Sequence, residues 1–187
     1  MKEELTNIIL PEGNFRTKVL FFDESDRELL YRLYREWLSL SKHLREIKSR
    51  GVNIPEGISE GAFCLETGAV RIINSIPKAN TSFDCYNLKN HVRIQVKGCS
   101  VIPDLTSFGP KSVWDKIYFL DFFRDGSWDG KFDIYEIDNN DIYCRQVNAS
   151  QTLKQQQQQK RRPRFSIYKD IIRPRHLQPI MTGDLHK

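Results

Sequence analysis

Three polar side chains in the middle of the sequence bring together a carboxylate, an amide and an amine. Asp84 is followed, after a gap of ten residues, by Gln95 and Lys97, which a single valine separates. Carboxylate and amide oxygens can hold a hard cation such as Mg²⁺, which polarises a phosphate ester and lowers the pKa of water. A lysine ammonium can stabilise the charge that develops on the phosphate during attack. These residue types therefore indicate metal-assisted hydrolysis of a phosphodiester.

The segments that carry these residues have the partial alternation of a β-hairpin. The expected strands cover residues 82–86 and 92–97, with a polar turn centred near Lys89. Because side chains alternate between faces along a strand, Gln95 and Lys97 share one face and Val96 points to the other. The hairpin places Asp84 alongside them, so the sequence predicts that the three polar groups meet.

A long amphipathic helix is predicted over residues 25–47, upstream of the hairpin. Ser25 and Glu28 have the spacing of a capping box. Large apolar side chains then recur at helical spacing, and Gly51 provides a C-terminal stop. We assign the charged face of this helix to solvent and give it no catalytic role.

The remaining elements suggest a small mixed domain. A second helix is predicted over residues 55–73, a loop over 103–112, a third helix over 113–123 and a strand over 132–137. This order is typical of an α/β or α+β domain. A chain of 187 residues is long enough for one domain with its own core, so we expect residues 1–187 to form a single domain.

Positive charge is concentrated at the C-terminal end of the chain. Residues 151–187 hold nine Lys or Arg and two Asp, which gives this segment a net charge of +7 and leaves −2 for the first 150 residues. A basic segment next to a mildly acidic body favours a polyanionic partner. Its arginines and its run of five glutamines have the side chains that read guanine and adenine, although the same residues also fit an exposed polar tail. The candidate DNA-contacting residues are Lys111, Lys160, Arg161, Arg162 and Arg164.

The sequence lacks the signals of a secreted or membrane protein. Its four cysteines show no metal-ligand spacing and are expected to be reduced thiols. The first residues are acidic where a signal peptide would be basic, and no apolar run reaches the ~20 residues of a membrane span. We therefore expect a cytoplasmic protein without a membrane partner.

The hairpin resembles the active site of the PD-(D/E)XK nucleases. In that superfamily an Asp at the end of one strand is followed by Asp or Glu, any residue and Lys on the partner strand. Here the motif reads Phe83-Asp84 and Gln95-Val96-Lys97, with Phe in place of Pro and Gln in place of the second acid. The resemblance implies a restriction-endonuclease-like core, with a central mixed sheet flanked by helices. It also implies a Mg²⁺ cofactor held by Asp84 and Gln95, with the missing acid disfavouring a second tightly held metal.

The same resemblance implies a glutamate on the helix that precedes the Asp strand. Glu60 and Glu66 are the candidates, and six residues of helix separate them by about 240°, so they cannot both face the site. The stretch 55–60 resembles the sequence before this helix in several small restriction enzymes. We therefore favour Glu60 as the fourth catalytic residue, with Asp84, Gln95 and Lys97.

Over residues 54–179 the sequence is similar to small type II restriction endonucleases. The similarity is clearest in residues 95–98, 107–115 and 161–166. It implies cleavage of double-stranded DNA at a short palindromic or interrupted-palindromic site of the GCNGC kind, with a cognate DNA methyltransferase as companion. Cleavage of both strands implies a homodimer, for which the apolar side of the 25–47 helix is the expected contact. The motif leaves two alternatives open: another DNA nuclease on the same fold, such as a junction resolvase or repair nuclease, and a non-catalytic DNA-binding protein.

Overall fold

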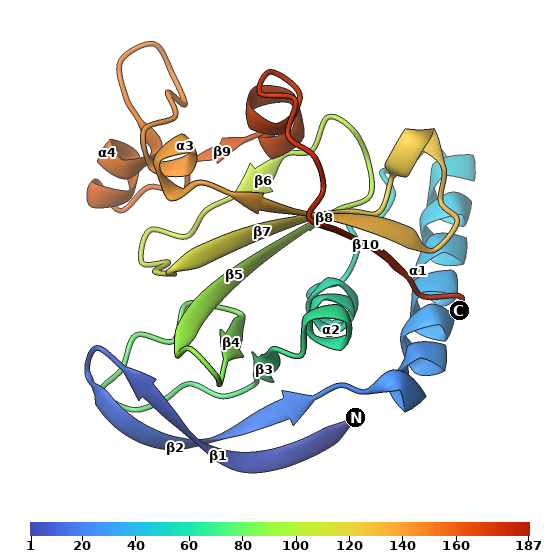
Figure 1. Cartoon of the computed structure of the whole chain (residues 1–187). Coiled ribbons are helices and arrows are strands. Elements are labelled where there is room, and N and C mark those ends of the chain that lie inside the picture. Colours follow the sequence, from blue (N-terminus) through green and yellow to red (C-terminus); the bar gives the residue numbers. More distant parts are fainter.

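The computed structural model describes residues 1–187, with the side chain of Asp125 left out. Its centre is a curved mixed sheet in which β5 and β7 are parallel and all other neighbours antiparallel (Figure 1). The strand order is β1-β2-β3-β4-β5-β7-β8-β10. The bounds are β1 (Lys2–Leu10), β2 (Gly13–Phe21), β3 (Val70–Ile72), β4 (Cys85–Asn87), β5 (Val92–Cys99), β7 (Lys116–Asp121), β8 (Lys131–Ile137) and β10 (Met181–Asp184).

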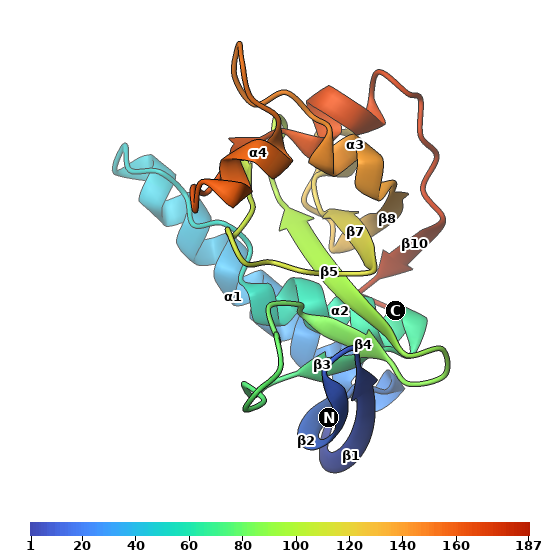
Figure 2. The same cartoon turned by 90° about the vertical axis from the view of Figure 1, so that its left-hand side faces the viewer.

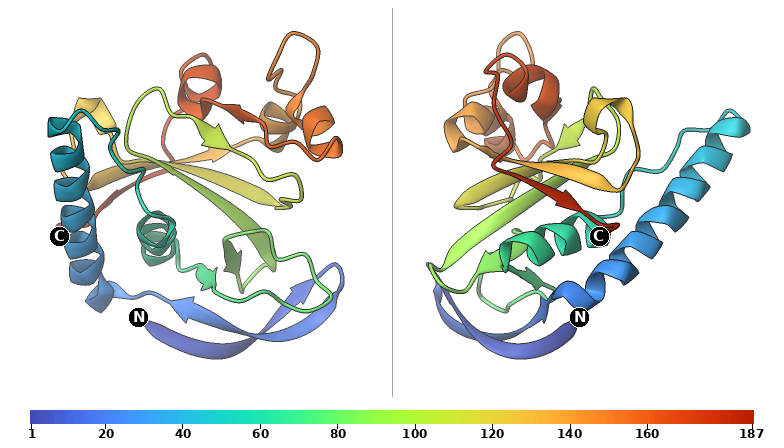
Figure 3. Two further views of the ribbon diagram at one scale, coloured as in Figure 1. Left: turned by 180° about the vertical axis from the view of Figure 1, so that it is seen from behind. Right: turned by 45° about the vertical axis from the view of Figure 1, so that its right-hand side comes forward.

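Helices cover both faces of this sheet, as the resemblance implied. The long helix α1 (Arg27–Glu46) and the shorter α2 (Glu56–Thr67) lie on one face, with α2 nested in the curve of the sheet (Figure 3). The short helices α3 (Asn139–Tyr143) and α4 (Leu153–Gln158) lie on the other face (Figure 2). A separate two-stranded sheet, β6 (Thr106–Ser107) and β9 (Arg164–Phe165), lies beside them. The remaining turns are the 3-10 segments Glu24–Asp26 and Arg124–Gly126 and a π-helical segment, Tyr168–Ile172.

Buried apolar side chains form three clusters around the sheet. The first lies beneath α1 and α2 and includes Tyr34 and Phe63, and the second lies on the opposite face and includes Phe119. The third fills the concave side of the β1–β2 hairpin, around Val19. Full burial of a large apolar side chain contributes roughly 1.5–3 kcal/mol to the free energy of folding. Because buried clusters lie on both faces of the sheet, the packing on each face stabilises the fold.

Several expected elements are confirmed. The predicted hairpin is β4 and β5, and the predicted strand at 132–137 is β8. The long helix is α1, but its capping box lies two residues earlier than expected. Asp23 accepts from the Ser25 amide and Asp26 accepts from the Asp23 amide, because a 3-10 turn precedes the helix and takes the cap that Ser25 was expected to provide.

Two expected helices are wrong in whole or in part. Residues 113–123 were expected to be helical, but they contain β7, in which five of six residues are buried. A strand buried on both faces has no alternation, so its apolar run resembles a buried helix. The second helix ends at Thr67 and not near Ile73, because Gly68 adopts the left-handed conformation at φ 70° and turns the chain into β3.

The two ends of the chain contribute elements that the sequence pattern did not predict. At the N-terminus β1 and β2 pair over nine residues each, and at the C-terminus β10 pairs with β8. The glutamine run, expected to be an exposed polar segment, forms most of α4, whose first turn is capped by Thr152 and Gln155. All four cysteines are free. No helix in the described part of the chain is long and apolar enough to cross a bilayer.

Candidate active site

The site lies along a free edge of β5. β4 pairs with β5 only over Val92 to Ile94, whereas β7 pairs with it from Ile94 to Cys99. From Gln95 onward β5 therefore has a hydrogen-bonded strand on one side only. The opening left by the short β4 is the place where the candidate residues meet.

Asp84 lies at the point where β4 begins and is held by the strands on both sides. Its amide donates to Ile94 O at 3.0 Å, and its carbonyl accepts from Ile72 N at 3.0 Å. Its carboxylate Oδ2 accepts from the Val96 amide at 2.8 Å, in the place where a neighbouring strand would otherwise supply a carbonyl. The other oxygen, Oδ1, receives no hydrogen bond from the described residues and remains available to a ligand.

Gln95 and Lys97 reach the same region from β5, as the alternation predicted. Gln95 is almost fully buried, and its Nε2 donates to Asp84 Oδ2. Lys97 is partly exposed and lines the cleft together with Asp84. Burial raises the pKa of Asp84, and the nearby Lys97 ammonium acts in the opposite direction. The structure thus brings the three predicted residues together.

Of the two candidate glutamates, Glu60 is the one at the site. It lies on α2, is 6% exposed and forms an ion pair with Arg71 of β3. Burial and the charge of Asp84 raise the pKa of Glu60 to about 7, although Arg71 lowers it. Glu66 faces away and pairs with Arg27 at 2.8 Å.

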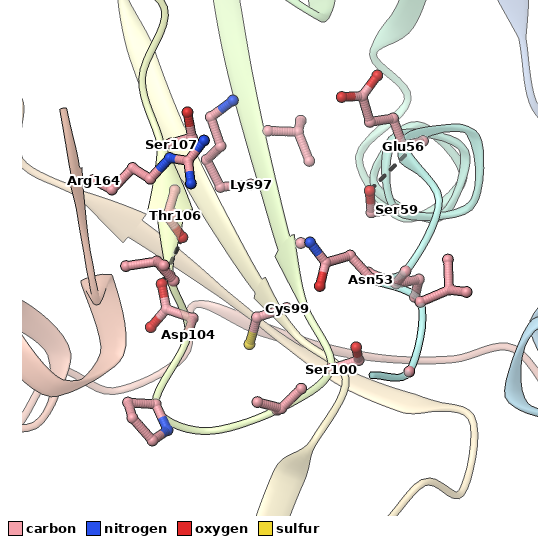
Figure 4. Close-up of a pocket in the computed structure, with 18 of the residues that line it drawn as sticks. Asn53, Glu56, Ser59, Lys97, Cys99, Ser100, Asp104, Thr106, Ser107 and Arg164 are labelled. Carbon is pink, nitrogen blue, oxygen red and sulfur yellow. Dashed lines mark hydrogen bonds between the residues drawn. The ribbon is translucent and has the colours of Figure 1, made fainter. Parts of the chain in front are cut away.

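Glu56 is a third carboxylate that the sequence reasoning missed. It lies in the first turn of α2, is exposed and lines the cleft (Figure 4). Its charge raises the pKa of both Glu60 and Asp84. The signal was present in the sequence, because residues four apart lie on one face of a helix and Glu56 is four residues before Glu60.

Gly98 allows α2 to approach β5 closely at this point. A Cβ at Gly98 would lie 2.7 Å from the Cβ of Ser59, which is closer than such atoms come in proteins. Ser59 directly precedes Glu60, and Gly98 directly follows Lys97. The absence of a side chain at Gly98 therefore sets the short distance between the helix and the strand that carry the site.

The cleft of about 890 Å³ at this edge extends from α2 and β5 to the β6–β9 sheet. Of the candidate DNA-contacting residues, Arg162 and Arg164 line it. Lys160 and Arg161 are exposed outside the cleft, just after α4. Lys111 is also exposed outside it, and its carbonyl accepts from Asn80 and Ser82. Two of the five expected basic residues therefore line the cleft, and the other three lie on the surface outside it.

The donor set suits a hard divalent cation. No group of three or more His, Cys, Asp or Glu is placed to enclose a metal ion among the described side chains. Mg²⁺ does not need such a cage, because it keeps several waters and is held by one or two carboxylates together with substrate phosphate. Asp84 Oδ1 and the amide oxygen of Gln95 are suitable ligands. Burial raises the pKa of the Asp84 and Glu60 carboxyls, and a cation bound beside them would favour their ionised forms.

A mixed sheet with an acid, an amide and a lysine at the free edge of a central strand, beside a glutamate-bearing helix, defines the PD-(D/E)XK class of nucleases. The sequence comparisons give the family. Residues 22–174 match the Bsp6I restriction endonuclease family, and the chain belongs to this family. It is 34% identical over 166 residues to the type II restriction enzyme Bsp6I of Bacillus sp. (strain RFL6), covering 87% of this chain and 90% of that relative. The expected type II site-specific deoxyribonuclease is thereby confirmed. No solved structure matches the chain.

Proposed function

We propose that this restriction endonuclease hydrolyses double-stranded DNA with Mg²⁺ at the edge of β5, with Asp84, Gln95, Lys97 and Glu60 as its catalytic residues. The observation that carries the proposal is the meeting of Asp84, Gln95 and Lys97 at the point where β4 begins. There Asp84 Oδ2 accepts from the Val96 amide of β5 at 2.8 Å, in the place of a neighbouring strand's carbonyl.

Each residue has a role that follows from its position. Asp84 and the Gln95 oxygen would hold Mg²⁺, which supplies the charge that polarises the scissile phosphate and lowers the pKa of water. Lys97, on the same face of β5, stabilises negative charge on the phosphate oxygens and orients the attacking water. Glu60 adds negative charge beside Asp84 when it is ionised, and Arg71 holds its carboxylate in place.

The proposal is tested by cleavage of a sequenced plasmid in the presence of Mg²⁺. The wild-type protein should cut both strands at one short sequence, and Asp84→Ala and Lys97→Ala should each slow cleavage at least about 100-fold. Lys116→Ala is a matched control, because this exposed lysine of the adjacent strand pairs with Glu136 at 2.8 Å outside the cleft. Near-normal cutting by either site variant would refute this active site. Cleavage that requires a four-way junction or a mismatch would favour a resolvase or repair nuclease, and binding without any cleavage would favour a DNA-binding protein.

The enzyme acts as a homodimer in this proposal, with α1 as the contact. Leu33 and Leu40 of α1 and its C-cap residue Ile47 recur every seven residues and are 39%, 53% and 74% exposed. Seven residues are close to two helical turns, so the three side chains form one apolar stripe. Arg45, at the C-terminal end of the same helix, lines the cleft. A two-fold pairing of α1 helices would relate two clefts by the symmetry axis, one for each strand of a duplex.

A symmetric dimer fits a palindromic or interrupted-palindromic site, such as GCNGC. Such an enzyme would work in the cytoplasm with a DNA methyltransferase of the same specificity, which protects the host sequence. Light scattering of the protein–DNA complex tests the stoichiometry, and one protomer per duplex during concerted double-strand cleavage would contradict the symmetric arrangement. Mapping the cut ends identifies the site itself.

A further inference from the structure

The β6–β9 sheet presents one arginine to the cleft from a defined strand position. Arg164 pairs with Ser107, and the buried Phe165 pairs with the buried Thr106. Because cross-strand partners share a face of a sheet, Arg164 and Ser107 project together. Both line the cleft, and Figure 4 shows them extending towards the side where Lys97 lies.

Aromatic packing holds this small sheet in place. Phe165 stacks on Phe108 with ring centroids 5.3 Å apart and an interplanar angle of 13°, and Phe108 is fully buried. The Phe108 amide donates to Pro163 O at 3.0 Å, which extends the pairing by one residue. Arg164 therefore stands between two buried residues, Pro163 and Phe165, and its backbone is fixed on both sides.

A buried carboxylate ties the sheet to the chain around it. Asp104 is 7% exposed and accepts four hydrogen bonds from both sides of the sheet. The donors are Thr106 Oγ1 at 2.5 Å, Ser166 Oγ at 2.6 Å, Ile167 N at 3.0 Å and Tyr168 N at 3.0 Å. These hydrogen bonds fix the backbone that carries Arg164. Recognition of a base requires such accurate placement of a side chain, whereas electrostatic attraction to the phosphate backbone does not.

The guanidinium of Arg164 is free for a ligand. It makes no hydrogen bond or ion pair with the part of the chain that the structure describes, whereas Arg27, Arg71 and Arg93 are each paired with a carboxylate. Arginine presents a planar fork of donors, and guanine presents two acceptors, O6 and N7, in the major groove. A two-stranded β-ribbon is narrow enough to enter that groove.

We propose that Arg164, supported by Ser107, reads one guanine of the recognition sequence from the major groove. The proposal deepens the function proposed above and rests on it. Since Lys97 lines the same cleft, the guanine lies close to the cleaved phosphate. Arg162 lines the cleft too, but it precedes β9 and has no partner on β6, so we assign the reading position to Arg164.

Arg164→Lys tests this proposal, because lysine keeps the charge and loses the fork. Arg16→Lys is the matched control at an exposed arginine of β2 outside the cleft. Cleavage rates are compared on the duplex that the wild type cuts and on duplexes in which one guanine at a time is replaced by 7-deazaguanine, which lacks the N7 acceptor. We expect Arg164→Lys to cut the unmodified duplex roughly 10–100-fold more slowly. One modified guanine should slow the wild type and leave Arg164→Lys with little further loss, since both changes remove the same contact.

Other outcomes overturn the proposal. Wild-type rates for Arg164→Lys on every duplex would show that the side chain contacts no base. A slowing that multiplies with that of each modified guanine would assign Arg164 to the phosphate backbone. Failure of the wild type to cut any duplex is a different result, because it refutes the proposed function itself and the base-reading role with it. Thermal unfolding should be the same for both variants and the wild type, because the two side chains are exposed.

Discussion

Replacement of Glu60 by Gln should remove a pH dependence of stability that the active site builds into the fold. Burial and the charge of Asp84 raise the pKa of Glu60 from 4.5 to about 7. An acid whose pKa is raised by folding costs stability once the pH exceeds its unfolded pKa, and the cost grows until the pH passes its folded pKa. The wild-type protein should therefore be more stable at pH 5 than at pH 8 on account of this group.

The size of the effect follows from the pKa shift. Ionisation of Glu60 costs about 3 kcal/mol when complete, of which about 2.5 kcal/mol falls between pH 5 and pH 8. Gln does not ionise. The free energy of unfolding of Glu60→Gln, relative to that of the wild type, should therefore be about 2.5 kcal/mol higher at pH 8 than at pH 5. Packing changes caused by the substitution are the same at both pH values, so they cancel in this comparison.

Urea unfolding of both proteins at pH 5 and pH 8, without divalent cations, measures this gain. Glu66→Gln is the matched control, because it makes the same chemical change on the same helix outside the cleft. If the stability of Glu60→Gln relative to the wild type is the same at both pH values within about 0.5 kcal/mol, the account of Glu60 as a buried acid that Arg71 compensates only in part is refuted. Added Mg²⁺ should reduce the gain, since a cation at Asp84 favours the ionised form of Glu60.

Four further substitutions probe the site, the β6–β9 sheet and the assembly. Gln95→Glu should retain measurable cleavage with an altered preference between Mg²⁺ and Mn²⁺, because the acid restores the usual ligand charge; total loss of cleavage with normal DNA binding would assign the amide a hydrogen-bonding role. Asp104→Ala leaves four donors unpaired, so urea unfolding should show a loss of roughly 2–4 kcal/mol, and an unchanged midpoint would contradict its structural role. Arg161→Ala should flatten the slope of log K against log salt by about one unit without altering sequence preference, as measured by DNA binding at several salt concentrations. Leu40→Glu should give one protomer per duplex by light scattering, whereas Ser39→Glu, with the same charge change beside the apolar stripe, should leave the dimer intact.

The meeting of Asp84, Gln95 and Lys97 could be predicted because it depends only on local rules. Alternation along β5 and one tight hairpin are sufficient to place the three groups together. The position of Glu56 follows from a local rule as well, because it lies about one helical turn before Glu60 on α2.

The errors in the fold have physical causes that lie beyond local pattern. β7 is buried on both faces, so its apolar run carries no strand periodicity. In β1 the apolar residues Leu5 and Ile9 are half exposed while Ile8 and Leu10 are buried, so neither face of that strand is uniformly apolar. β1 and β7 form strands because they pair with segments that a short window of the sequence does not contain.

Local sequence patterns also do not separate the functional positions of individual basic residues in the C-terminal segment. Charge counting treats Arg161 and Arg164 alike, and the sequence offers no way to separate them. The structure separates them because Lys160, at φ 59°, ends α4 and β9 then directs the following residues along the cleft. Residues such as Ile167 are also fully buried, so point substitutions probe this segment better than truncation.

The shortness of β4 has a consequence for tolerance to insertions and deletions. Asp84 meets Gln95 and Lys97 only while three residues of β4 pair with β5 in the observed register, with Cys85 opposite Ile94. One residue added to the turn after β4 would shift that register and turn the carboxylate to the other face of the sheet. The loop before Asp84 could vary in length without this effect. Natural variants of this enzyme should therefore differ in length before Asp84 and keep the distance from Asp84 to Lys97 constant.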